Sequence, residues 1–255
     1  MHAACRLSLS LVGFLAAALL FAAPVQAQDT DGLDLRWGVS AGAVSSAFQG
    51  DARVFNNFFC PGGEACTLEA QPLPKFDGRQ RGVQFGVSLQ AGVTDWLTTR
   101  TELNYVQTGG AVRRTARGYR ESATYRINYL TLPLLAEVRS PWRIGALRPA
   151  LLVGPALGVT LDWRTQSTVE RAPQPLASSG DVSQGPIGIE EVPGAAMAAV
   201  GGIELAYALP SGRAVALEVR YRRGLTGAVV REDAVGRSTA RTGAVSVGLR
   251  YVFSR

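Results

Sequence analysis

The 255-residue sequence contains one histidine, His2, and one lysine, Lys75. Histidine is the side chain most often used as a general base and as a metal ligand. Its scarcity argues against a histidine-dependent hydrolase, a histidine-ligated metal site and a haem protein, the more so because His2 lies in a segment that we expect to be removed. The composition predicts a protein that is not an enzyme and needs no cofactor.

Long hydrophobic runs are also scarce, and the one clear example stands at the N-terminus. Residues 1–27 predict a secretory signal peptide, because Arg6 precedes an apolar run over 7–23 and small residues follow at 24–27. A retained membrane anchor is the alternative, which the polar residues after position 27 disfavour. No later run reaches the roughly 20 apolar residues of a transmembrane helix. We therefore expect residues 28–255 to form one exported domain that can cross a membrane only with strands.

Cysteine is rare, with three residues in the chain. Cys5 leaves with the signal peptide, whereas Cys60 and Cys66 remain and flank a Pro-Gly-Gly turn. A metal site would need further histidine or cysteine ligands, which the exported part lacks. Two cysteines in one loop of an exported protein predict a disulfide bond between Cys60 and Cys66 that stiffens this loop.

Alternation of apolar and polar residues with period two dominates the exported sequence and predicts β-strands. Most of the candidate strands have 12 or more residues, which is longer than the strands of soluble domains. The predicted strands are 35–48, 82–93, 97–108, 124–139, 147–163, 195–209, 213–225 and 245–253.

The connections between these strands alternate between long and short. Such alternation is typical of membrane barrels, which have long extracellular loops and tight periplasmic turns. The sequence therefore predicts an all-β fold, an eight-stranded antiparallel up-and-down transmembrane β-barrel in the cell outer membrane. A soluble exported sandwich is the alternative fold. The long connections are 49–81, 109–123, 164–194 and 226–240.

Charged residues fall on the polar face of the predicted strands, which points into a membrane barrel whose apolar face meets lipid. Eight strands leave a lumen that side chains fill, so we expect these charges to form ion pairs. A narrow passive channel for ions or small solutes is the alternative. The predicted lumen network is Arg100, Glu102, Arg148, Glu204, Glu218, Arg220 and Arg250, and further interior candidates are Arg36, Glu137 and Asp162.

A second group of charges lies in the predicted second extracellular loop and consists of Arg113, Arg114, Arg117 and Arg120. Guanidinium groups bind phosphates in a bidentate manner, so lipopolysaccharide is a candidate ligand; solvated charges paired with nearby carboxylates are the alternative. With Arg6 removed, 25 basic and 20 acidic residues remain. This modest excess does not indicate a nucleic-acid partner.

Several short motifs resemble the PorT-like outer-membrane β-barrel proteins. The clearest is Asn-Tyr-Leu-Thr-Leu-Pro-Leu-Leu at 128–135, and the others lie at 201–204, 218–221, 224–226 and 248–253. The resemblance implies an eight-stranded barrel of a Gram-negative outer membrane and no particular activity. These barrels usually end on an aromatic residue, whereas here Ser254 and Arg255 follow Phe253, so we expect weaker recognition by the barrel assembly machinery.

These observations together predict a non-enzymatic protein with a structural or interaction role. We expect its extracellular loops 49–81 and 164–194 to carry that role, with outer-membrane lipids around a monomeric barrel and an unidentified protein as a further partner.

Overall fold

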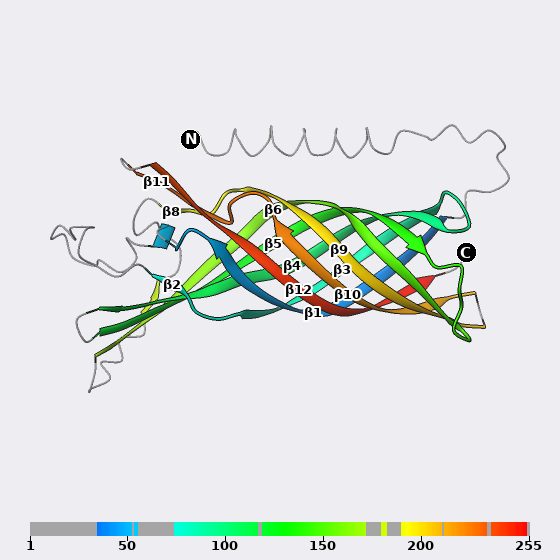
Figure 1. Ribbon diagram of the computed structural model, residues 1–255, viewed down its shortest axis with the longest axis horizontal. Helices are drawn as coiled ribbons and strands as arrows, with labels where there is room; N and C mark the ends of the chain where they lie inside the picture. Colours follow the sequence, from blue (N-terminus) through cyan, green and yellow to red (C-terminus); the bar gives the residue numbers. More distant parts are fainter. Residues whose placement is uncertain are drawn as a thin grey trace. The chain divides into compact units, whose positions relative to one another are not determined.

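The computed structural model describes residues 35–52, 54–55, 74–116, 119–171, 180–182, 190–210, 212–233 and 236–253. Eight long strands form one antiparallel ring (Figure 1), because β1 pairs with β3 on one side and with β12 on the other. The predicted all-β antiparallel barrel is confirmed. The strands of the ring, in order, are β1 (Leu35–Gly50), β3 (Gln80–Gly92), β4 (Leu97–Ala116), β5 (Tyr119–Arg139), β6 (Leu147–Arg171), β9 (Ala195–Ala208), β10 (Ala214–Gly224) and β12 (Gly236–Phe253).

Four short strands extend the sheet at the end with the longer connections, which in outer-membrane barrels is the extracellular end. β2 (Lys75–Phe76) pairs with β4, and β7 (Gly180–Val182) pairs with β6. β11 (Val229–Asp233) pairs with β12 and with β8 (Glu190–Glu191). Within the described part of the chain, no helix is long and apolar enough to span a membrane.

The predicted long loop at 109–123 is wrong. β4 and β5 instead continue as a paired hairpin as far as Ala116 and Tyr119. The period-two pattern persists there, since Val112 and Ala123 are buried whereas Arg113 is exposed. The polar outward residues of this hairpin lie beyond the apolar belt, so a strand that leaves the membrane resembles a loop in composition. β6 and β12 likewise extend into 164–171 and 236–244.

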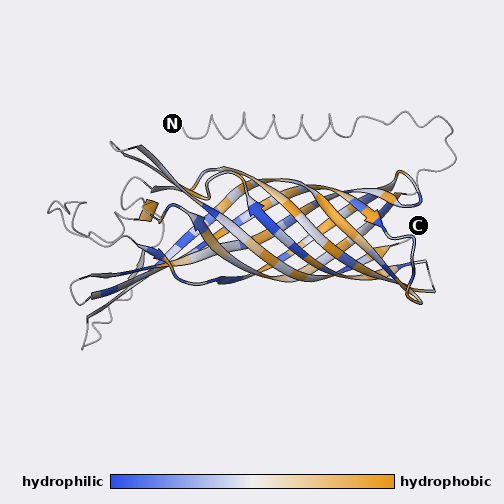
Figure 2. Cartoon of the chain, in the orientation of Figure 1, coloured by the Kyte–Doolittle hydropathy of each residue, from blue (hydrophilic) through white to orange (hydrophobic). Residues whose placement is uncertain are grey.

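Apolar and polar residues alternate along the strands of the barrel (Figure 2), and the apolar ones are the exposed ones. On β3, Val83 and Phe85 are 50% and 53% exposed, whereas the neighbouring Ser88 and Gln90 are buried. A soluble sandwich would bury the apolar face and expose the polar one, so this alternative is wrong. The outer surface is suited to lipid.

Part of the lumen is apolar. A cluster of buried side chains fills the extracellular end of the barrel, and we call it the apolar plug. The connection after β1 contributes Val54 and Phe55, and the ring of Phe55 lies 5.2 Å from Phe48 and 4.9 Å from Tyr125 between centroids. The buried residues of the plug are Phe48, Val54, Phe55, Val112, Ala123, Tyr125, Ile127, Tyr129, Ala228, Val229 and Ala240.

Small residues make room for polar side chains in the narrow lumen. A Cβ atom at Gly86 would lie 1.9 Å from Oδ1 of Asn104 and 2.4 Å from the carbonyl oxygen of Leu103. Only glycine therefore allows Asn104 to occupy its place between β3 and β4. From that place Asn104 donates a hydrogen bond to the buried carboxylate of Glu102.

Candidate functional site: the charged network in the lumen

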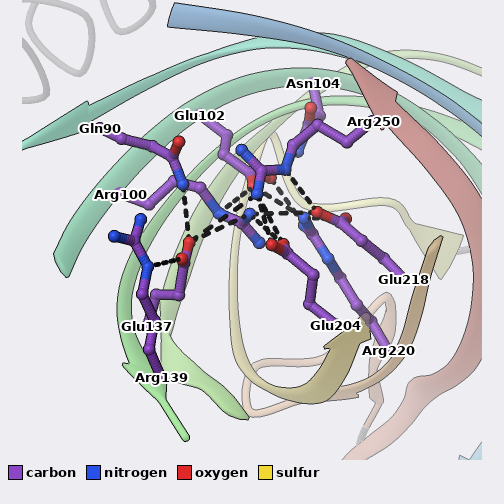
Figure 3. Close-up of polar contacts among 10 residues, drawn as sticks. All are labelled: Gln90, Arg100, Glu102, Asn104, Glu137, Arg139, Glu204, Glu218, Arg220 and Arg250. Carbon is purple, nitrogen blue, oxygen red and sulfur yellow. Dashed lines mark hydrogen bonds and ion pairs between the residues drawn. The ribbon is translucent and has the colours of Figure 1, made fainter. Parts of the chain in front are cut away.

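Seven buried charged side chains meet in the lumen, and we call them the charged network (Figure 3). They come from β4, β5, β9, β10 and β12, and so they join strands that are not neighbours in the ring. None is more than 6% exposed. The members are Arg100, Glu102, Glu137, Glu204, Glu218, Arg220 and Arg250.

Arg100 lies at the centre of the network. Its Nη1 donates to Glu204 Oε2 at 2.7 Å and to Glu218 Oε1 at 3.0 Å. Its Nε lies 2.9 Å from Glu102 Oε1, and Nη1 lies 3.5 Å from Glu137 Oε2. One guanidinium therefore interacts with all four carboxylates of the network.

The other two arginines cross-link the same carboxylates. Arg220 binds Glu102 in a bidentate manner, with Nη1 at 2.7 Å from Oε2 and Nη2 at 2.8 Å from Oε1, and it also pairs with Glu218. Arg250 donates from Nη2 to both oxygens of Glu204, at 2.6 and 2.7 Å, and from Nε to Glu218 at 2.8 Å. Charge-assisted pairs of this geometry are the strongest hydrogen bonds of proteins.

Three residues at the edge complete the network. Gln90 and Arg139 donate to the two oxygens of Glu137 at 2.6 and 2.8 Å, and Asn104 donates to Glu102 at 2.7 Å. With Arg139, four arginines face four glutamates, so the formal charges balance. A balanced and hydrogen-bonded arrangement avoids the large cost of a buried unpaired charge.

The structure brings together six of the seven residues predicted for the lumen, whereas Arg148 lies apart from them. Arg148 is at the start of β6 on the periplasmic rim, where its Nη2 donates to the carbonyl oxygen of Asp95 at 3.2 Å. Period-two alternation gives the face of a strand but not the height of a residue along the barrel, so it could not separate Arg148 from the rest.

Two of the further interior candidates lie elsewhere in the barrel, and one joins the network. Glu137 occupies the network, whereas Asp162 accepts a hydrogen bond from Asn128 and lies 3.9 Å from Arg164. Arg36 lies near the start of β1, at the opposite end from the plug. The sequence analysis did not assign Gln90, Asn104 or Arg139 to the network, although all three stand at inward positions of their strands.

Of the arginines predicted to contact lipopolysaccharide, the structure places Arg114 apart from Arg113 and Arg120. Arg113 is exposed and pairs with Asp77 at 2.6 Å, and Arg120 is also exposed. Arg114 is buried on the opposite face of β4, so it cannot contact a ligand outside the barrel together with Arg113. Because residues 109–123 were expected to form a loop, the strand alternation that places Arg113 and Arg114 on opposite faces was not expected. Arg117 lies outside the described residues.

A row of exposed arginines crosses the outer face above the apolar belt, and sequence reasoning did not identify it. Arg126 of β5 pairs in register with Arg164 of β6 on one side and with Gly109 of β4 on the other. Arg113 and Arg120 lie on the same face towards the tip of the hairpin. We call Arg113, Arg120, Arg126 and Arg164 the outer arginine row.

Several predictions fall outside the described residues. These are the signal peptide at 1–27, the disulfide between Cys60 and Cys66, and the terminal residues Ser254 and Arg255, all of which stay predictions. Within the residues that the structure describes, no group of three or more histidine, cysteine, aspartate or glutamate side chains could bind a metal ion.

Comparison with known protein families gives one match, which covers most of the chain. Residues 13–253 match the family described as "Outer membrane protein beta-barrel domain". No curated protein matches the sequence.

Among solved structures, the chain is similar to Ail, the attachment invasion locus protein of Yersinia pestis, with 12% identity, a TM-score of 0.38 and coverage of 87% of this chain and 100% of that one. It is also similar to Neisserial surface protein A, with 14% identity, a TM-score of 0.35 and coverage of 84% of this chain and 95% of that one. For the outer membrane protease OmpT from Escherichia coli, the identity is 10%, the TM-score is 0.27, and the match covers 88% of this chain and 100% of that one. These TM-scores are too low to support an argument about function, so the relationship of the chain to known proteins rests on the family match.

Proposed function

Because the chain belongs to the outer membrane protein beta-barrel domain family, we propose that it is a non-enzymatic barrel whose structural or interaction role is performed at its extracellular end. The observation that carries the proposal is the filled lumen. In the described part of the chain, buried side chains fill the lumen, so we expect the barrel to act on its surroundings through its outer surface and its extracellular extension.

The filling of the lumen occurs at two levels. The charged network links Arg220 of β10 with Glu102 of β4, which are opposite strands of the ring. Towards the extracellular end, Phe55 and its neighbours form the apolar plug. An ion would have to displace both the ion pairs and the aromatic side chains, which disfavours the alternative of a narrow passive channel.

The carboxylates of the network also support a structural role in preference to a catalytic one. Glu102, Glu204 and Glu218 each accept hydrogen bonds from at least one guanidinium. A general base needs a free lone pair within reach of a substrate. These carboxylates are buried and already bound to guanidinium groups, so a substrate would have to displace those arginines to reach them.

We further propose lipopolysaccharide as the lipid partner, through the outer arginine row. Arg126 and Arg164 are neighbours of like charge on adjacent strands. Such a pair is unfavourable unless an anion lies between the side chains, and the phosphates of lipopolysaccharide lie in the outer leaflet. Arg113 and Arg120 would extend the same contact, whereas Arg114 faces inward and is no longer a candidate.

Within the family, we propose membership of the PorT-like proteins on the basis of the motif at 128–135. These residues form the part of β5 that begins at a register shift between Asn128 and Tyr129. The inward Tyr129 packs in the apolar plug, and the following residues form the wall of the barrel down to Glu137. The motif thus links the plug to the charged network.

The proposal is tested by recording from planar bilayers that contain the purified protein. We expect no conductance steps under conditions in which heat-modifiable migration on gels shows a folded barrel. Reproducible steps whose size changes in Arg220→Ala would establish the channel instead. In parallel, cross-linking in intact outer membranes should capture a partner through the hairpin of β4 and β5, and this capture should be lost when only the hairpin tip, residues 115–120, is deleted, which leaves the apolar plug intact.

A further inference from the structure

A small cavity lies inside the barrel between the charged network and the apolar plug. Its volume is about 30 Å³, and its lining includes Thr108 of β4, Tyr129 of β5, Arg222 of β10 and Thr242 of β12. The alternation along each strand directs all four side chains inward. Such a volume holds about two water molecules or one small ion.

Arg222 is the only one of these residues that is charged, and it has no carboxylate of its own. No ion pair joins Arg222 to any acid in the ranges that the structure describes. Arg220, two positions away on the same face of β10, repels it, and the carboxylate that attracts it is Glu102. Both oxygens of Glu102 already accept hydrogen bonds from Arg220.

The charged network cannot neutralise Arg222, since its four glutamates are balanced by four arginines. An arginine cannot escape burial by losing its proton, because the guanidinium stays charged in proteins. Arg222 is half-buried at the cavity, and an uncompensated charge there is costly. Within the residues that the structure describes, no further carboxylate is available to Arg222, so we look to an anion from solution as the source of negative charge.

A second observation indicates a ligand in the same cavity. Thr108 is 2% exposed, and its Oγ1 is buried without a hydrogen-bond partner among the described residues. Buried hydroxyl groups are normally hydrogen-bonded, and an unpaired one calls for an unseen partner. A ligand that accepts hydrogen bonds would satisfy Thr108 and neutralise Arg222 together.

We propose that this cavity binds a small inorganic monovalent anion, chloride under physiological conditions, between the guanidinium of Arg222 and the hydroxyl of Thr108. The small volume favours such an ion over the larger phosphate esters and carboxylate metabolites. The bound anion lies between the network and the plug, and so it stabilises the closed lumen without passing through it.

The direct test uses bromide, which replaces chloride and scatters X-rays anomalously. The protein is purified from outer membranes into detergent with gluconate as the only anion and is then crystallised with sodium bromide. We expect an anomalous peak in the cavity in contact with Arg222 and Thr108. Crystals that diffract well and show only water in the cavity would overturn the proposal.

A second test measures thermal unfolding during a titration from sodium gluconate to sodium bromide at constant ionic strength. Bromide should raise the melting temperature of the wild type and of Arg223→Met, whose arginine is adjacent but points outward. Arg222→Met should show no dependence on bromide. Thr108→Val should bind bromide about tenfold more weakly, because it loses one hydrogen bond to a charged ligand.

The outcomes separate a bound anion from a general effect of salt. A bromide effect of equal size in Arg222→Met and Arg223→Met would refute the site. If Arg222→Met does not fold, the shift in affinity of Thr108→Val and the anomalous map decide the matter. None of these results depends on whether the extracellular end binds a partner.

Discussion

Arg220 and Glu102 form a bidentate ion pair across the barrel, with N···O distances of 2.7 and 2.8 Å. Their strands β10 and β4 stand opposite each other in the ring of eight. The pair therefore acts as a strut between opposite walls, whereas the hydrogen bonds of the sheet join only neighbouring strands. Arg100 and Arg250 add further links around it.

Removal of one partner of this strut should destabilise the barrel strongly. Arg220→Met leaves Glu102 buried with fewer counter-charges, and breaking a buried pair in this way costs about 3–5 kcal/mol. The measurement is equilibrium unfolding by guanidinium chloride in detergent micelles. Arg164→Met is the matched control, since its side chain is 75% exposed, and it should change the free energy of unfolding by less than about 0.5 kcal/mol.

The double variant Arg220→Met with Glu102→Met distinguishes a strut from a merely buried charge. A hydrophobic pair of similar volume often replaces a buried ion pair with little loss. We expect the double variant to recover part of the stability lost by Arg220→Met. Additive losses from the two substitutions would show that these residues do not act as a pair.

The inward direction of Glu102 and Arg220 could be predicted from sequence, because period-two alternation assigns each residue of a strand to one face. Their pairing could not be predicted, since it depends on the relative heights of strands that do not touch. Arg148 shows the same limit, because it has the correct face but lies at the rim. Arg114 was misplaced for a different reason, since its polar surroundings suggested a loop where the strand continues.

The contribution of the connection after β1 to the apolar plug could not be predicted. Its residues Val54 and Phe55 come from a connection that carries no period-two pattern, and only the fold brings them beside Phe48 and Tyr125. Loss of a buried aromatic ring leaves a cavity and costs about 3–5 kcal/mol. Phe55→Ala should therefore lower the free energy of unfolding, measured by guanidinium chloride titration in micelles, by roughly this amount.

The same variant separates the contributions of the two levels of closure. Phe55→Ala should remain silent in planar bilayers, because the charged network still closes the lumen beneath the plug. Conductance in Phe55→Ala alone would show that the plug is the sole barrier and would weaken the assignment of the network as a closure.

The seam that closes the ring carries a stacked aromatic pair. The rings of Trp37 and Phe253 lie 3.7 Å apart between centroids with an interplanar angle of 10°, and Tyr251 contacts Phe253 edge-on at 4.7 Å. Aromatic pairs contribute about 0.5–1.5 kcal/mol beyond their burial. Phe253→Leu should lower the unfolding free energy by about 1 kcal/mol. It should also slow refolding into lipid vesicles, which is followed by tryptophan fluorescence.

Phe85→Leu is the control, because it removes a stack with Tyr105 that lies away from the seam. It should lower stability to a similar extent but leave the refolding rate unchanged.

The outer arginine row predicts a measurable preference for phosphorylated lipid. Arg126 and Arg164 are exposed cross-strand neighbours, and two guanidinium groups can clamp one phosphate with bidentate hydrogen bonds. Each such bond to a charged group is worth about 1.5–3 kcal/mol. The double variant Arg126→Gln with Arg164→Gln should therefore bind lipopolysaccharide at least about tenfold more weakly than the wild type in a fluorescence titration.

Arg143→Gln serves as the control for this titration, because Arg143 is exposed in the turn at the periplasmic end, away from the outer leaflet. Equal losses in the control and the double variant would indicate a general effect of positive charge, and the row would then be solvated charge without a specific ligand. Dephosphorylated lipopolysaccharide should bind the wild type and the double variant alike, since the difference between the two proteins resides in the phosphate contacts.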